Sequence, residues 1–165
     1  MYTENAVTIR ADLATIYQLA AAVERWPALL PHYRAVRVLA ARDDRRLVAM
    51  AARRGWIPVR WSAVQVCEPA VPRIRFRHVR GVTRGMAVEW VFESGADGVR
   101  VSIRHELRLG WPLVGRLVAD RIIGPLFVAY VAGQTLRRIK ALAERRQPMA
   151  GAVAPRPLGS EAGST

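Results

Sequence analysis

The chain has 165 residues, of which 52% are apolar, so it fits one domain with a single sizeable core. Its net charge of +13 comes from arginine and one lysine, Lys140. A charge of this size indicates anionic partners, either a membrane surface or nucleic acid. The arginines are spread over nearly the whole chain without a nucleic-acid-binding motif, which argues against nucleic acid. The single cysteine, Cys67, excludes an internal disulfide and a cysteine-rich metal site. No apolar run reaches membrane-spanning length and no leader pattern opens the chain, so we expect a cytoplasmic protein.

The N-terminal part predicts a strand followed by helix. Residues 5–10 (NAVTIR) alternate as in a strand. Asp12 stands at the N-cap position of a helix, and the apolar residues after it recur at helical spacing. Pro27 either ends this helix or starts a second short one, which Pro31 closes.

From Tyr33 to Leu109 the apolar residues recur with period two. Turn signals of Asp, Gly and Pro divide this region into six expected strands. Their ranges are 33–42, 45–54, 59–68, 73–81, 84–94 and 99–109. Charged residues alternate with apolar ones in several of them, which is typical of an antiparallel sheet with one wet face and one face on a core.

A long helical stretch is expected from about residue 113 to Arg146, with a kink at Gly124-Pro125. Residues 147–165 are rich in Gly, Pro, Ala and Ser and predict a disordered tail. The sequence therefore predicts one α+β domain over residues 1–146. In it, a curved antiparallel sheet of about seven strands wraps around a long C-terminal helix, and two short helices follow the first strand.

Four stretches, in this order, resemble the START-like helix-grip superfamily called SRPBCC, and within it the polyketide cyclase/dehydrase and coenzyme-Q-binding START group. They are ERWPALLPHYRAVRVL (24–39), IPVRWSAVQVCEP (57–69), RIRFRHVRGVTRGMAVEWVFE (73–93) and GPLFVAYVAGQTLRRIKALAE (124–144). The resemblance spans residues 3–146. It implies a Bet v 1-like fold with a deep apolar cavity, which relatives use for polyketides, isoprenoid quinones, sterols or other lipids. Function must still be argued from the pocket.

The inward faces of the expected elements supply the lining of that cavity, which should be mostly apolar with a few polar groups. The predicted ligand-binding residues are Trp61, Phe76, His78, Met86, Trp90, Phe92, Phe127 and Tyr130. Small residues at 49, 51 and 63 leave room beside them. Core packing is the alternative role for the tryptophans, and a neutral core imidazole is the alternative for the histidines.

Tyr33, Gln65 and His105 are the candidate catalytic residues. The resemblance implies a tyrosine after the tryptophan-proline segment and an arginine on a central strand, which together polarise a polyketide for aldol closure and dehydration. Tyr33 matches the tyrosine, but alignment through Trp61 puts Gln65 in place of the arginine. Gln65 can hydrogen-bond a carbonyl without offering a charge. Arg53 is the nearest substitute, and a solvent-facing Arg53 is equally open.

Two functions follow. The first is a polyketide cyclase/aromatase that works without a cofactor and meets its substrate on an acyl carrier protein. The second is a non-catalytic protein that binds or transfers a lipid or isoprenoid quinone, docking transiently at the inner face of a membrane. The absent arginine favours the second function, and Tyr33 favours the first, which we prefer. We expect no metal, because His32, His78 and His105 lack ligand-like spacing.

Overall fold

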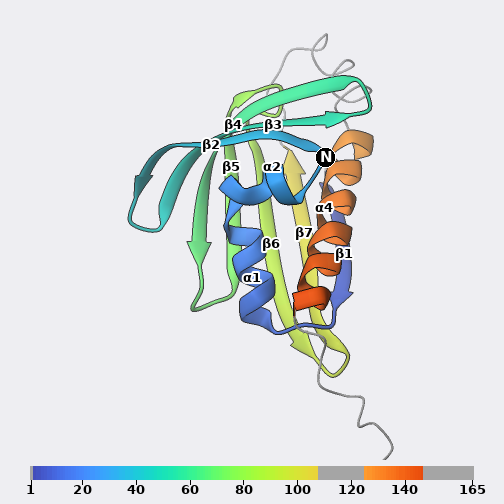
Figure 1. Cartoon of the computed structure of the whole chain (residues 1–165). Coiled ribbons are helices and arrows are strands. Elements are labelled where there is room, and N and C mark those ends of the chain that lie inside the picture. Colours follow the sequence, from blue (N-terminus) through green and yellow to red (C-terminus); the bar gives the residue numbers. More distant parts are fainter. Residues whose placement is uncertain (1, 108–124, 147–165) are drawn as a thin grey trace, which may run out of the picture.

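The computed structural model describes residues 2–107 and 125–146, which form an antiparallel sheet with helices on one face (Figure 1). The sheet has seven strands in the order β1-β7-β6-β5-β4-β3-β2. Their bounds are β1 Tyr2–Ile9, β2 Tyr33–Arg42, β3 Arg45–Arg54, β4 Ile57–Glu68, β5 Arg73–Gly81, β6 Met86–Gly95 and β7 Gly98–Leu107. The helices are α1 Leu13–Ala21, the 3-10 turn η1 Val23–Arg25, α2 Trp26–Leu29 and α4 Pro125–Arg146. The predicted helix-grip fold is confirmed.

The six strands expected after Tyr33 are all present, and the first strand begins at Tyr2 rather than at residue 5. Three expectations lie outside the described residues. They are the end of the last strand at Leu109, the first part of the C-terminal helix with its kink, and the tail. Within the described ranges, no helix is long and apolar enough to cross a membrane.

Side-chain alternation sets the inner face of the sheet. On β5, Ile74, Phe76 and His78 are buried, whereas Arg75 and Arg77 between them are exposed. On β3, the buried residues are Val48, Met50 and Ala52, so residues 49 and 51 face outward. The expectation that these two alanines leave room in the cavity was therefore wrong, because a shift by one residue exchanges the faces of a strand. Ala63 does face inward.

Asp12 caps α1 as predicted. Its Oδ1 accepts a hydrogen bond from the Thr15 backbone N–H at 2.8 Å, and its Oδ2 accepts one from the Thr15 hydroxyl at 2.7 Å. Of the two alternatives for Pro27, the structure has the second, since Pro27 lies in the first turn of the short helix α2. The preceding helix, α1, already ends at Ala21. A proline is tolerated there because the first backbone N–H groups of a helix have no partner within it.

Polar contacts from three of its residues join α4 to the N-terminal segment. Lys140 Nζ donates to the Thr8 carbonyl at 2.8 Å, and Glu144 accepts from the Arg10 backbone N–H at 2.9 Å. The Asn5 amide donates to the carbonyl of Ala129 at 3.4 Å. The apolar face of the helix, with Leu136 and Ile139 almost fully buried, therefore rests on the sheet in a defined orientation.

Glycine is required at the turn before β7. Gly98 has a φ of 126°, and a Cβ there would collide with the Ile9 carbonyl oxygen. Gly98→Ala is expected to lower the free energy of unfolding by at least about 2 kcal/mol. Gly55→Ala, at a φ of 58° with no atom within 4 Å of the new Cβ, is the control and should cost about 1 kcal/mol. Urea unfolding measures both, and equal losses would contradict the collision.

Candidate functional site

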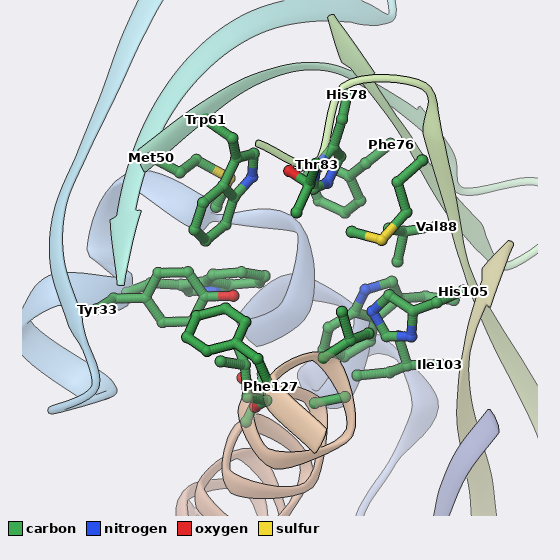
Figure 2. Close-up of a pocket in the computed structure, with 17 residues that line it drawn as sticks. Tyr33, Met50, Trp61, Phe76, His78, Thr83, Val88, Ile103, His105 and Phe127 are labelled. Atoms are coloured by element: carbon green, nitrogen blue, oxygen red, sulfur yellow. Dashed lines mark hydrogen bonds between the residues drawn. The ribbon is translucent and has the colours of Figure 1, made fainter. Parts of the chain in front are cut away.

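A cavity lies between the inner face of the sheet and α4 (Figure 2). Its sheet side is largely aromatic, and its helix side is formed by one face of α4 from Phe127 to Thr135. The volume is about 60 Å³, which is room for a few water molecules, whereas pockets for drug-sized ligands run to about 300–1,000 Å³. Side chains fill most of the space in this conformation, so a larger ligand would have to displace some of them.

The structure brings most of the predicted site residues together around this cavity. Those that line it are Tyr33, Trp61, Phe76, His78, Met86, Trp90, His105 and Phe127. Gln65, Phe92 and Tyr130 are not among the lining residues. The cavity is therefore apolar with a small number of polar groups, which is the usual composition of a site for a hydrophobic ligand.

Tyr33, the first residue of β2, is 7% exposed and held by two tryptophans. Its ring centroid lies 4.8 Å from that of Trp26 and 6.2 Å from that of Trp61, which it meets edge-on. Burial raises the pKa of Tyr33, and the nearby Thr135 side chain opposes this only in part. The phenol therefore stays protonated and can serve as a hydrogen-bond donor.

His78 is fixed by two contacts. Its Nδ1 lies 2.6 Å from the hydroxyl oxygen of Thr83, and its ring stacks on Trp61 at 5.6 Å with an angle of 9° between the planes. Burial, with a smaller contribution from His105, lowers the pKa of His78 to about 3. This imidazole is neutral at physiological pH, so its contacts fit the core role that the sequence left open.

His105 and Trp61 differ from His78, because each presents a buried nitrogen without a partner. The Nδ1 of His105 and the Nε1 of Trp61 have no hydrogen bond to any described protein group. An unsatisfied buried polar group typically costs about 1–3 kcal/mol. Burial also lowers the pKa of His105 to about 4, so its ring is neutral. Both nitrogens are available to a polar group of a ligand: the Trp61 N–H as a donor, and His105 Nδ1 as a donor or an acceptor according to its tautomer.

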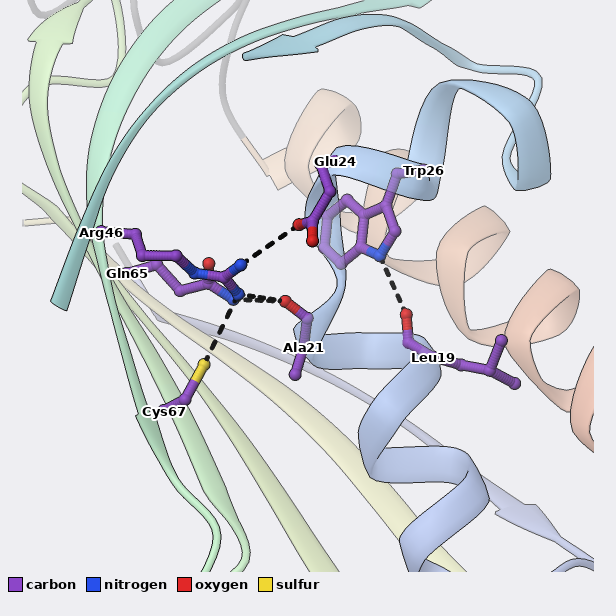
Figure 3. A network of polar contacts seen from close by, with 7 residues as sticks. All are labelled: Leu19, Ala21, Glu24, Trp26, Arg46, Gln65 and Cys67. Carbon is purple, nitrogen blue, oxygen red and sulfur yellow. Dashed lines mark hydrogen bonds and ion pairs between the residues drawn. The ribbon is translucent and has the colours of Figure 1, made fainter. Parts of the chain in front are cut away.

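Gln65 belongs to a polar network behind the cavity (Figure 3). Its Nε2 donates to the carbonyl of Ala21 at 2.9 Å, and Arg46, its partner across the β3–β4 ladder, donates to the same oxygen at 2.6 Å. Arg46 also pairs with Glu24 at 3.2 Å. Ala21 ends α1, where carbonyl groups lack partners within the helix. Gln65 therefore holds the end of α1 on the sheet.

Arg53, the proposed substitute for the absent arginine, is exposed and lies outside the cavity lining. It borders a surface hollow together with Tyr130, His32 and Arg138. The guanidinium next to Gln65 belongs instead to Arg46 of β3. Sequence spacing along one strand could not identify Arg46 as the neighbour of Gln65, because the two residues are brought together by the pairing of β3 with β4.

The remaining residues are explained by packing. Phe92 contacts the ring of Tyr17 of α1 at 5.4 Å, beyond the cavity. His32 is buried, with its Nε2 2.9 Å from the hydroxyl of Thr135. Sequence reasoning missed Thr83 and Thr135 as lining residues. Thr135 could have been found in the sequence as a polar residue within the apolar stripe of the last helix. Thr83 lies in a turn, where no periodic pattern indicates which side chains face inward. Among the described residues, no group of His, Cys, Asp and Glu is arranged to hold a metal ion.

The role of Gln65 predicts a loss of stability without a loss of binding. Gln65→Leu should lower the free energy of unfolding by about 1–2 kcal/mol, because the Ala21 carbonyl keeps only one of its two donors. The affinity for a fluorescent apolar probe, measured by titration, should stay unchanged. Arg53→Gln is the exposed control and should change neither quantity. A weakened probe affinity at normal stability in Gln65→Leu would show that Gln65 contacts the ligand.

The histidines predict a pH-dependent stability. Burial lowers the pKa of His32, His78 and His105 to about 4, 3 and 4, whereas an unfolded histidine has a pKa of about 6.5. The unfolded chain therefore binds more protons below pH 6.5, and stability present above that pH is lost as the pH falls towards 4. Urea unfolding between pH 7 and pH 5 should show this decline. His105→Phe should reduce the slope by up to about 1.4 kcal/mol per pH unit, and an unchanged slope would contradict it.

The chain is similar to known proteins in sequence and in fold. Residues 9–122 match the family model described as "Polyketide cyclase / dehydrase and lipid transport". The bifunctional cyclase/dehydratase of the actinorhodin polyketide synthase of Streptomyces coelicolor is 29% identical over 148 residues, covering 87% of this chain and 44% of that protein. A putative polyketide cyclase of Streptomyces halstedii is 29% identical over 102 residues, covering 59% of this chain and 93% of that protein.

Solved structures add a likeness in fold. The Zhui aromatase/cyclase from Streptomyces sp. R1128 superposes with a TM-score of 0.73 at 18% identity, covering 88% of this chain and 94% of that one. The chain spans less than half the length of the bifunctional actinorhodin relative. Because the family model covers most of the strands and the first helices, this chain belongs to the polyketide cyclase/dehydrase and lipid transport family.

Proposed function

We propose that the protein is a polyketide cyclase of the aromatase type, which holds a reactive poly-ketone chain in the cavity and assists its ring closure and loss of water without a cofactor. One observation carries the proposal: three buried residues with polar groups, Tyr33, Trp61 and His105, line one cavity with largely aromatic walls. Three polar groups in an apolar enclosure suit a flat ligand that carries oxygen atoms.

The proposed chemistry needs hydrogen-bond donors for a developing negative charge. In the aldol step, the α-carbon loses a proton to the neutral imidazole of His105 and attacks a carbonyl carbon, so the carbonyl oxygen becomes negative. Tyr33 stays protonated and Trp61 can only donate, so both can stabilise this oxygen. The oxygen then takes up this proton from the His105 imidazolium, so it becomes a hydroxyl group and the imidazole is neutral again.

Loss of water requires a second proton transfer. An α-proton leaves, a carbon–carbon double bond forms, and the hydroxyl departs with a proton as water. His105 is neutral, so it can accept the α-proton and pass a proton to the departing hydroxyl. Its lowered pKa favours the second half of this relay, because a buried imidazolium readily gives up its proton.

Ligand entry requires the cavity to widen from about 60 Å³. Two methionines, Met50 and Met86, line it beside the aromatic rings. Methionine side chains have flexible thioethers that adapt to different neighbours, so they can make room at a small energetic cost. An acyl carrier protein that presents the poly-ketone and a location in the cytoplasm belong to the same proposal.

One observation supports a second function, the binding or transfer of an apolar ligand: among the described residues, no arginine or lysine lines the cavity. A neutral cavity suits a lipid or an isoprenoid quinone as well as a polyketide, and such a protein would bind or transfer its ligand without catalysis. Trp56 is 90% exposed and Val82 53% exposed, and both lie in turns at one end of the sheet. They could support transient docking on a membrane surface.

Tyr33→Phe separates the two functions. Incubated with a poly-ketone made in situ by a minimal polyketide synthase, the variant should form the cyclised aromatic product about 10²-fold more slowly, as expected for the loss of one oxyanion donor. Arg53→Gln is the control and should keep the rate. Native mass spectrometry of the purified protein should show an aromatic polyketide. A bound quinone or phospholipid, with no effect of Tyr33→Phe on product formation, would replace the cyclase by the transfer protein.

A further inference from the structure

The outer face of the sheet has two halves that differ in charge balance. Over β5 to β7, β1 and the C-terminal end of β4, arginines lie beside carboxylates, as in Arg73–Glu89 at 3.3 Å, Arg75–Glu68 at 2.6 Å and Arg104–Glu4 at 3.3 Å. The adjoining parts of β2 to β5, residues 34–37, 49–51, 60–62 and 80, contain no acidic residue. Their positive charge is therefore uncompensated by the described part of the chain.

Four of these arginines surround a hollow of about 580 Å³, which we call the arginine cradle. Its rim is Arg34, Arg37, Arg60 and Arg80, and its floor is Ala35, Ala49, Ala51 and Ser62. All four guanidinium side chains are exposed, and none has an ion pair with another described residue. The cradle is separate from the cavity, because it lies on the opposite face of the same strands.

Strand register explains the shape of the cradle. Arg37 pairs with Ala49, Ala49 with Ser62, and Ser62 with Arg80, so one row crosses β2, β3, β4 and β5. With about 4.8 Å between strands, the two arginines that end this row are about 14 Å apart at the backbone. In the next row Ala35 pairs with Ala51, and Ala51 with Arg60. Small side chains thus fill the middle, and long cations stand at the ends.

We propose that the arginine cradle binds an acidic α-helix of a partner protein. A helix with its side chains is about 10 Å wide, so it fits between rim residues about 14 Å apart. The small floor lets the helix approach closely, and its carboxylates reach the guanidinium groups at the rim, which suit bidentate pairing.

Other anionic partners fit less well. A membrane surface is flat and would leave the floor of a concave hollow empty. A single phosphate is too small to meet arginines on opposite sides of the cradle. Helical carboxylates spaced at i, i+3 and i+4 form a row on one face and match a rim of several cations. The inference does not depend on the proposed cyclisation.

The test uses a capped helical peptide of about 20 residues, long enough to be helical in water, with glutamates along one face. Its counterpart with glutamine at those positions is the peptide control. Binding to the full chain is measured by fluorescence anisotropy at low and high salt. We expect the glutamate peptide to bind more tightly, and the binding to weaken as salt screens the ion pairs.

Two charge variants separate the cradle from the general positive charge. Arg37→Gln with Arg60→Gln should raise the Kd of the glutamate peptide about tenfold, as for the loss of two exposed ion pairs. Arg75→Gln with Arg100→Gln removes the same charge from the paired half of the outer face, where Arg100 lies 3.8 Å from Glu4. This variant should change the Kd less than about twofold. Equal effects of the two double variants would overturn the proposal.

A third variant tests the floor. Ala49→Arg adds positive charge but fills the middle of the cradle, so we expect weaker binding of the glutamate peptide. Tighter binding by this variant would show attraction by net charge alone and would overturn the proposal. Stronger binding of anionic phosphatidylglycerol vesicles or duplex DNA, lost in Arg37→Gln with Arg60→Gln, would also overturn it. Circular dichroism confirms that each variant is folded.

Discussion

The packing of Trp26 is the contact on which the cavity depends. Its ring lies 4.8 Å from Tyr33, 5.9 Å from Trp90 and 6.4 Å from Phe76. Its indole N–H donates to the carbonyl of Leu19 at 3.1 Å. One side chain thus joins the short helices to three strands. The direction of the Tyr33 hydroxyl follows from this packing, since the tyrosine ring has tryptophans on two sides and is almost fully buried.

Burial divides the polar groups of the inner face into structural and available ones. The amide nitrogen of Gln65 donates to the Ala21 carbonyl, and the His78 ring contacts Thr83 and Trp61. The nitrogens of Trp61 and His105 have no such use within the described residues. Native proteins rarely leave buried polar groups without partners. These two atoms belong to cavity-lining residues, so they identify the part of the cavity where a polar group of a ligand would be stabilised.

The regular part of the fold could be predicted from the sequence, because period-two alternation and turn residues record the sheet directly. Ile74, Phe76 and His78 were assigned to the inner face correctly in this way. Where alanine occupies both faces, as in β3, the pattern carries no such information, and residues 49 and 51 were placed on the wrong side. The position of Gln65 could not be deduced either, because its partners come from α1 and from the neighbouring strand. Contacts between elements distant in sequence leave no periodic signal.

The distribution of charge limits how such a cavity can act. None of the described arginines and lysines is buried, so water and salt screen their charge over about 8 Å, and burial keeps the histidines of the core neutral. An oxyanion formed in the cavity would therefore gain little from the arginines outside. Its stabilisation would depend on oriented donors, and a donor is worth more in a dry enclosure than in water. In the proposed cyclisation, the stabilisation of the oxyanion therefore falls to Tyr33 and Trp61, because no arginine or lysine of the described residues lines the cavity.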